Sequence, residues 1–158
     1  MVTVAERTPV RKEVKPINFL FYRTQTTVGQ LVNFLNVAKD LQKEAVQYHL
    51  RMVGPVHWHY FGFAGDESKE FTLEVAVPVE QIPAEYDGSF HFKRTEPFRC
   101  VALQHEGPWL DLPQAYGVLF QYIQMNGLRP TGANREIYLQ ADFQHADANV
   151  TEVQIGIE

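Results

Sequence analysis

The sequence has a single cysteine and no long apolar run, and each absence excludes a class of protein. With Cys100 alone, the chain contains no internal disulfide and no metal site built from cysteines. No stretch approaches the roughly 18 consecutive apolar residues that span a bilayer, and the N-terminus lacks the apolar core of a signal peptide. We therefore expect a cytoplasmic protein with no membrane partner.

Basic residues are also scarce. The formal net charge of −5 argues against general affinity for nucleic acid, and no helix-turn-helix pattern precedes residue 15, so we expect no direct DNA binding. The chain has no glycine-rich phosphate loop and no serine or cysteine triad, and it implies no cofactor. Cys100 lies within an apolar stretch, where a thiol is usually inert.

The remaining composition is that of one globular domain, and its main feature is an internal repeat. The 158 residues are 45% hydrophobic and 21% charged. Residues 132–140 are similar to residues 54–62, and residues 151–157 to residues 73–79, both at an offset of 78 residues. A fixed offset with only two copies indicates a duplicated domain.

Apolar periodicity predicts one helix in each copy. The first runs from residue 28 to about residue 50, after a capping box formed by Thr27 and Gln30. The second begins with Asp111 as its cap and ends at Gly127. Strands are predicted for residues 17–23, 56–63, 70–79, 89–94, 98–104, 135–141 and 150–157.

Each copy therefore has the order β-α-β-β, and the predicted fold class is α+β. We expect tandem modules of this kind that form an antiparallel sheet, with the two long helices on one side. The first half covers residues 15–80 and the second residues 89–158, within one domain of residues 15–158. Residues 1–14 form an N-terminal edge segment, of which residues 1–13 are polar and irregular and residues 1–5 can pair as a short edge strand.

Glu136 is the sharpest candidate for a binding site. Its neighbours Ile137 and Leu139 indicate a strand in an apolar environment, where a carboxylate needs a cation, a hydrogen bond or a proton. An organic cation enclosed by aromatic rings would meet that need. The alternatives are a glutamate on an edge strand in water, or one paired with Arg135.

Three aromatic residues are candidate ligand contacts beside Glu136. The repeat aligns Trp58 with Glu136, and Tyr60 with Tyr138. Because side chains alternate along a strand, Trp58 and Tyr60 lie on one face of their strand. For the same reason, Glu136 and Tyr138 lie on the equivalent face of theirs. All four side chains converge if the halves meet about a twofold axis. The alternative is that the aromatic rings are ordinary core.

A turn follows the predicted strand at residues 98–104. His105 and Glu106 are adjacent in an extended segment, so their side chains point apart and they make a poor acid–base pair. We expect them to shape the turn at Gly107 instead. Trp109 follows this turn and is a further ligand-binding candidate, placed to close one end of a pocket.

His57 and His59 are two residues apart on a predicted strand, so both point the same way, as metal-binding histidines can. A metal site would need a further glutamate and histidine, and none of Glu74, His91 and His105 stands at a suitable spacing. We therefore predict no metal site and expect the two histidines to cap a face of the sheet.

Five short motifs carry a resemblance to a known family: Gln104-His105-Glu106-Gly107-Pro108-Trp109 and residues 115–116, 126–128, 135–139 and 152–155. In their order and spacing they resemble the GyrI-like family, which includes the effector-binding domains of multidrug-responsive AraC- and MerR-type regulators. The resemblance implies two β-α-β-β modules about a pseudo-twofold axis, with a small-molecule pocket between them. It also implies that a buried glutamate at the position of Glu136 meets cationic ligands. Residues 57–60 depart from the family pattern.

Three functions follow as hypotheses. The first is a stand-alone small-molecule-binding protein for an amphipathic, cationic or aromatic compound, acting as a sensor or a sequestering agent. The second, which the resemblance implies, is a hydrolase of cyclopropane-bearing DNA-alkylating compounds, with Glu136 and Tyr60 as candidate catalytic residues. The third is a protein–protein role like that of the gyrase inhibitors in the family. We favour the small-molecule-binding protein, because binding needs only a pocket of rigid side chains and one charge. The enzyme would also need a water molecule held beside Glu136.

Overall fold

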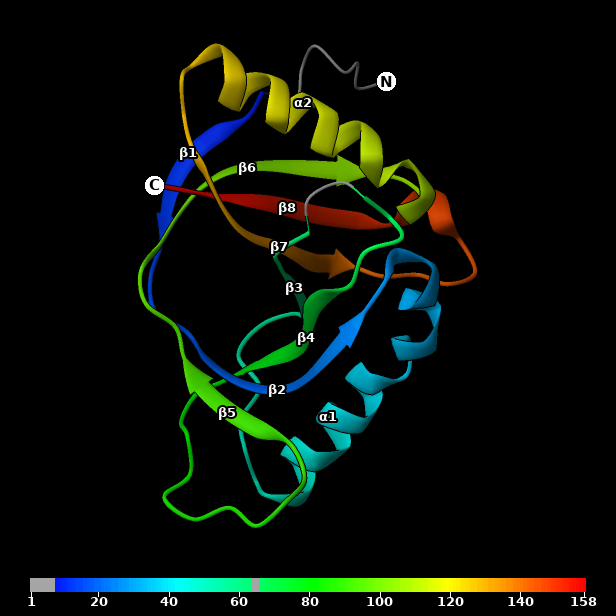
Figure 1. Cartoon of the computed structure of the whole chain (residues 1–158). Coiled ribbons are helices and arrows are strands. Elements are labelled where there is room, and N and C mark those ends of the chain that lie inside the picture. Colours follow the sequence, from blue (N-terminus) through cyan, green and yellow to red (C-terminus); the bar gives the residue numbers. More distant parts are fainter. Residues whose placement is uncertain (1–7, 64–65) are drawn as a thin grey trace. The chain divides into compact units, whose positions relative to one another are not determined.

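The computed structural model describes residues 8–63 and 66–158, and the chain divides into two compact units (Figure 1). Unit 2 is Lys15–Pro97, and unit 1 combines the N-terminal segment up to Val14 with Phe98–Glu158. The expected pairing of residues 1–5 lies outside the described residues.

Within its described residues, unit 2 has four antiparallel strands and one α-helix. The strands are β2 (Asn18–Thr26), β3 (His57–Phe61), β4 (Phe71–Val79) and β5 (His91–Arg94), in the order β3-β4-β2-β5. Between β2 and β3 lie a 3-10 helix, η2 (Val28–Phe34), and the helix α1 (Val37–Gln47). The helix α1 packs against β4 and β2, with Leu41 and Ala45 fully buried.

From residue 8 onward, unit 1 also has four antiparallel strands and one α-helix. The strands are β1 (Val10–Val14), β6 (Phe98–Glu106), β7 (Pro130–Gln140) and β8 (Val150–Ile157), in the order β1-β6-β8-β7. A 3-10 turn, η3 (Trp109–Asp111), leads into α2 (Leu112–Met125), and a second one, η4 (Ala146–Ala148), precedes β8.

The core of unit 1 lies between α2 and its sheet, and Figure 1 shows α2 running along β6 and β8. The helix contributes buried residues at helical spacing, and the strands contribute alternate residues, as expected for an amphipathic helix on a sheet. The core residues are Leu112, Ala115, Leu119 and Ile123 from α2 and Val101, Leu103, Val153, Ile155 and Ile157 from the sheet.

The strand register confirms the repeat. Trp58 pairs with Val75 in unit 2, and Glu136 pairs with Val153 at the equivalent place in unit 1. Both members of the second pair follow the first by the offset of 78 residues that the sequence predicted. The β-α-β-β order of each half and the α+β class are therefore confirmed.

Each unit has a fourth strand beside the first strand of its module. The strand β1 pairs with β6, and β5 pairs with β2. In both units a lysine of this fourth strand reaches a glutamate two strands away: Lys12 binds Glu152 at 2.6 Å, and Lys93 binds Glu74. The expectation that residues 1–13 are irregular was therefore wrong from Val10 onward, because a charged edge strand carries no apolar alternation.

The predicted cap hydrogen bonds of the two helices are not formed, although α2 does begin directly after Asp111, as the sequence predicted. The first helix is divided, since a 3-10 helix covers Val28–Phe34 and α1 begins only at Val37. Neither Thr27 nor Asp111 makes a side-chain cap hydrogen bond. Asp111 itself adopts a helical conformation at the end of η3, so the first free amides of α2 do not face its carboxylate.

The predicted stop of the second helix is confirmed. Gly127 has a φ of +64°, a left-handed conformation that suits glycine. The amide of Leu128 then donates to the carbonyl of Ile123 at 3.0 Å. Among the described residues, no helix has the length and apolar character needed to cross a membrane.

Gly156 provides a test of the packing of unit 1. A Cβ atom at this position would lie 2.5 Å from Thr131 Oγ1 and 2.6 Å from the carbonyl oxygen of Ala133, where β7 has an irregular register. We expect Gly156→Ala to lower the free energy of unfolding by about 1–3 kcal/mol, the usual cost of overpacking. Urea unfolding measures this change.

Gly117 serves as the control, because it lies exposed in α2 and a Cβ atom added there would meet no neighbouring atom within 4 Å. Gly117→Ala should raise the free energy of unfolding by about 0.5–1 kcal/mol through helix propensity. Equal stability of the two variants would contradict the packing argument.

Candidate functional site

Glu136 lies on β7 within unit 1, and its side chain is only 6% exposed. It pairs with Val153, a core residue under α2, so strand alternation turns the carboxylate toward the helix. The predicted burial is confirmed, and a glutamate on an edge strand in water is excluded. The neighbouring Arg135 points to the opposite face, where its guanidinium lies 4.0 Å from the ring centroid of Phe98.

Two phenols hold the Glu136 carboxylate. The hydroxyl of Tyr138 donates to Oε1 at 2.6 Å, and the hydroxyl of Tyr116 donates to Oε2 at 2.5 Å. The contact with Tyr138 agrees with the sequence expectation, whereas Tyr116 comes from α2 and was not predicted as a site residue. With a phenol on each oxygen, the carboxylate is fixed between a helix and its own strand.

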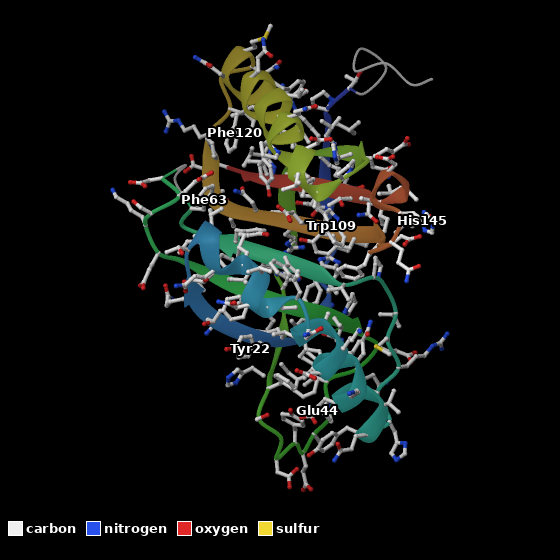
Figure 2. All side chains as sticks on the ribbon, turned by 90° about the vertical axis from the view of Figure 1, so that its right-hand side faces the viewer. Tyr22, Glu44, Phe63, Trp109, Phe120 and His145 are labelled. Carbon is white, nitrogen blue, oxygen red and sulfur yellow. The ribbon has the colours of Figure 1, made fainter. Side chains whose placement is uncertain are left out.

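Aromatic rings continue outward from these phenols. Trp109 in η3 lies edge-on to Tyr138 with 5.8 Å between ring centroids, and edge-on to Phe143 with 5.2 Å. On the other side, Tyr116 stacks on Phe120 at 6.5 Å. Figure 2 shows Phe120 at the helix α2 and Trp109 beside the orange strand β7. The structure thus brings together Glu136, Tyr138 and Trp109, three of the five predicted ligand-binding residues.

The turn before Trp109 is held by local hydrogen bonds. Nε2 of His105 donates to the carbonyl of Pro108 at 3.1 Å, and Gly107 adopts a φ of +124° that favours glycine. The amide of Gly107 donates to the carbonyl of Asn149 at 2.8 Å. His105 therefore shapes the turn, as the sequence predicted.

Trp58 and Tyr60 belong to unit 2, where both are buried on one face of β3. Tyr60 pairs with Leu73, and its ring lies 5.7 Å from that of Phe71. Their convergence with Glu136 stays a prediction.

His57 and His59 lie on the other face of β3 and form a buried chain of hydrogen bonds. The Lys93 ammonium can only donate, so Nδ1 of His59, at 3.3 Å, is an acceptor. Nε2 of His59 then carries the hydrogen and donates to Nδ1 of His57 at 3.1 Å. The two histidines extend the pair of Lys93 with Glu74 along this face of the sheet. Among the described residues, no group of three or more His, Cys, Asp or Glu is arranged to hold a metal ion.

Cys100 is fully buried in β6. Burial raises the pKa of its thiol to about 11, so the reactive thiolate is rare at neutral pH. This agrees with the expectation of an inert thiol.

Three residues of the site were not predicted as such: Tyr116, Phe143 and Asn149. Tyr116 follows Leu112 by four residues, so it lies beside the apolar stripe of α2 with a polar group at its tip. That spacing could have identified it. Phe143 and Asn149 lie in the loop between β7 and β8, for which periodicity gives no signal.

The fold and the site together define a small α+β domain that presents a buried carboxylate among aromatic rings. The chain belongs to the GyrI-like small molecule binding domain family, whose model matches residues 8–158. No curated protein matches the chain.

Solved structures of this fold are similar over nearly the whole chain. The C-terminal domain of EcmrR is 19% identical with a TM-score of 0.78, covering 96% of this chain and 98% of that one. In the complex of EcmrR with DNA, the TM-score is 0.80 at 20% identity, and this chain spans only 57% of the EcmrR chain.

Two further solved structures with this fold are a hydrolase and a protein with a bound organic cation. A hydrolase encoded by lin2189 of Listeria innocua has a TM-score of 0.63 at 18% identity, over 96% of this chain and 92% of that one. SAV2435, solved with bound tetraphenylphosphonium, has a TM-score of 0.59 at 13% identity, over 95% of this chain and 93% of that one. At these identities the likeness shows the fold.

The phenol contacts of Glu136 can be tested through stability. Tyr116→Phe removes a hydrogen bond to a buried carboxylate, so we expect it to lower the free energy of unfolding by about 1.5–3 kcal/mol. Tyr122→Phe, in the same helix, removes only an exposed hydrogen bond from Arg11 and should cost less than about 1 kcal/mol. Urea unfolding of both variants measures the difference, and equal losses would show that the Glu136 contact has no special strength.

Proposed function

We propose that this protein binds an amphipathic organic cation with aromatic groups at Glu136, as a sensor or a sequestering protein. The observation that carries the proposal is a carboxylate that is 6% exposed and accepts a hydrogen bond from a phenol on each oxygen. Phenols are neutral donors, so these two hydrogen bonds add no positive charge beside the carboxylate. A cation beside Glu136 would gain charge attraction and contact with ring faces.

Burial of Glu136 favours such a ligand on physical grounds. Water around an exposed carboxylate screens its charge, whereas a buried carboxylate attracts a cation through a medium of lower effective dielectric constant. The rings of Tyr116, Tyr138 and Trp109 supply apolar area beside this charge. We propose Trp58 and Tyr60 as further contacts, because they hold the repeat positions of Glu136 and Tyr138.

The bound ligand of a structural relative supports the choice of ligand class. SAV2435 was solved with tetraphenylphosphonium, which combines a positive charge with aryl groups. The family description, a small molecule binding domain, is compatible with a ligand of this size.

The charge of Glu136 is the feature to test first. We expect Glu136→Gln to weaken binding of tetraphenylphosphonium by about 1.5–3 kcal/mol, the range for an interaction with a charged group, which is roughly a 10- to 150-fold rise in Kd. Isothermal titration calorimetry on the purified protein measures this directly.

Two controls separate a local charge effect from other causes. Glu96→Gln changes the net charge by the same amount at an exposed position, and its Kd should stay within about twofold of the parent. Tetraphenylborate has the same shape and the opposite charge, so it should bind the parent far more weakly. Equal affinity for both ions, or no effect of Glu136→Gln, would refute the proposal.

A second candidate function is hydrolysis of a strained, alkylating ring. The specific observation in its favour is that Glu136, a potential base, contacts two phenols that are potential acids at 2.5 and 2.6 Å. The description of the Listeria innocua relative as a hydrolase adds support by analogy of fold. The acid candidate with a contact to Glu136 is then Tyr116 or Tyr138, in addition to the Tyr60 that the sequence suggested.

Turnover distinguishes the two candidates. The protein is incubated with an excess of a cyclopropane-bearing alkylating compound, and product is followed by mass spectrometry. We expect stoichiometric uptake without product, because the carboxylate is already held by two donors and the proposal requires no positioned water. Multiple turnovers that are lost in Glu136→Gln, and reduced in Tyr116→Phe or Tyr60→Phe, would establish the hydrolase instead.

A further inference from the structure

A continuous row of aromatic rings leads from the buried Glu136 to the protein surface. Tyr138 donates its hydroxyl to Glu136, Trp109 packs edge-on against Tyr138, and Phe143 packs edge-on against Trp109. Exposure increases along the row, from 6% at Glu136 to 69% at Phe143. The outer ring therefore presents most of its surface to solvent while its inner edge contacts the site.

The loop that carries Phe143 is held by its own hydrogen bonds. Oδ1 of Asp142 accepts from the amides of Gln144 and His145 at 2.9 and 3.0 Å. The hydrogen bond from the Gln144 amide is the main reason why the pKa of Asp142 is lowered. The carboxylate that holds this turn is therefore ionised at neutral pH. Oδ2 of the same carboxylate contacts Nδ1 of His145 at 3.2 Å. Phe143 is thus presented by a structured turn.

Asn149 connects this loop with the turn before Trp109. Its side-chain Oδ1 accepts from the amide of Asp142 at 2.6 Å, and its carbonyl accepts from the amide of Gly107 at 2.8 Å. The residue is only 1% exposed. One buried asparagine therefore sets the positions of both segments that carry the outer rings, on the side of unit 1 where Figure 2 shows Trp109 and His145.

We propose that Trp109 and Phe143 form a second aryl subsite, which selects cations with at least two linked aromatic rings over cations with one. The positive group lies at Glu136, and the outer ring of the ligand packs on Phe143. A single exposed phenylalanine needs no functional explanation. Phe143, however, is linked to Glu136 through a row of contacting rings, and the buried Asn149 holds its loop in place. Asn149 acts as a positioning residue for the subsite. The inference rests on the proposed function, since it assumes that Glu136 attracts the cation.

A matched series of ligands tests the subsite. Benzyltrimethylammonium, 4-phenylbenzyltrimethylammonium and the corresponding terphenyl compound carry the same cation with one, two and three rings. Calorimetric Kd values are measured for the parent protein, Phe143→Leu, Asn149→Ala and Glu136→Gln. Phe143→Leu keeps an apolar side chain without a ring at an exposed position, where the fold should tolerate it.

We expect Phe143→Leu to weaken at least one of the longer cations by about two- to tenfold, the value of an aromatic pair, and to leave the one-ring cation unchanged. Asn149→Ala should reproduce this loss without removing a ring, while Glu136→Gln should weaken all three cations. If the longer cations bind Phe143→Leu as tightly as the parent, the subsite is refuted while the proposed function stands. If no cation depends on Glu136, the proposed function itself fails.

Discussion

The burial of one carboxylate under α2 is the constraint on which the site depends. Glu136 shares a sheet face with the core residue Val153, so its charge lies where an apolar side chain would pack best. Such burial is tolerated only if polar partners satisfy the oxygens, and Tyr116 and Tyr138 do so. The Tyr116 contact thereby ties the helix to one strand register, because a slip of β7 by one residue would turn the carboxylate to the face away from α2.

The two copies of the repeat keep one polar feature and differ in another. Glu74 and Glu152 occupy equivalent positions, and each is bound by a lysine from the edge strand of its unit, Lys93 and Lys12. Glu136 has no acidic counterpart, since Trp58 holds the equivalent position. The shared ion pair therefore belongs to the architecture of the module, and the carboxylate of the site is specific to the second copy.

The modules could be predicted because they rest on local periodicity and on a fixed repeat offset. The burial of Glu136 was predicted from its apolar neighbours and from the resemblance to the GyrI-like family. The sequence did not predict β1, since a strand of charged residues is defined only by its partner β6, far along the chain. The cap at Thr27 failed because a 3-10 helix replaces the expected first turn. Phe143 and Asn149 depend on loop geometry, in which hydrogen bonds to the main chain decide position and hydrophobicity carries little information.

Unit 2 shows how this protein holds a cation of its own. The Lys93 ammonium pairs with Glu74 and lies 5.1–5.7 Å from the ring centroids of Phe19, Phe21 and Phe61. A carboxylate, a cation and several ring faces are therefore compatible with the interior of the module, and there the cation is tethered to the chain. At Glu136 the two hydrogen bonds come from neutral phenols, and rings continue toward the surface through Trp109. Our proposal assigns the same chemistry to Glu136, with a cation that comes from solution in place of a tethered lysine.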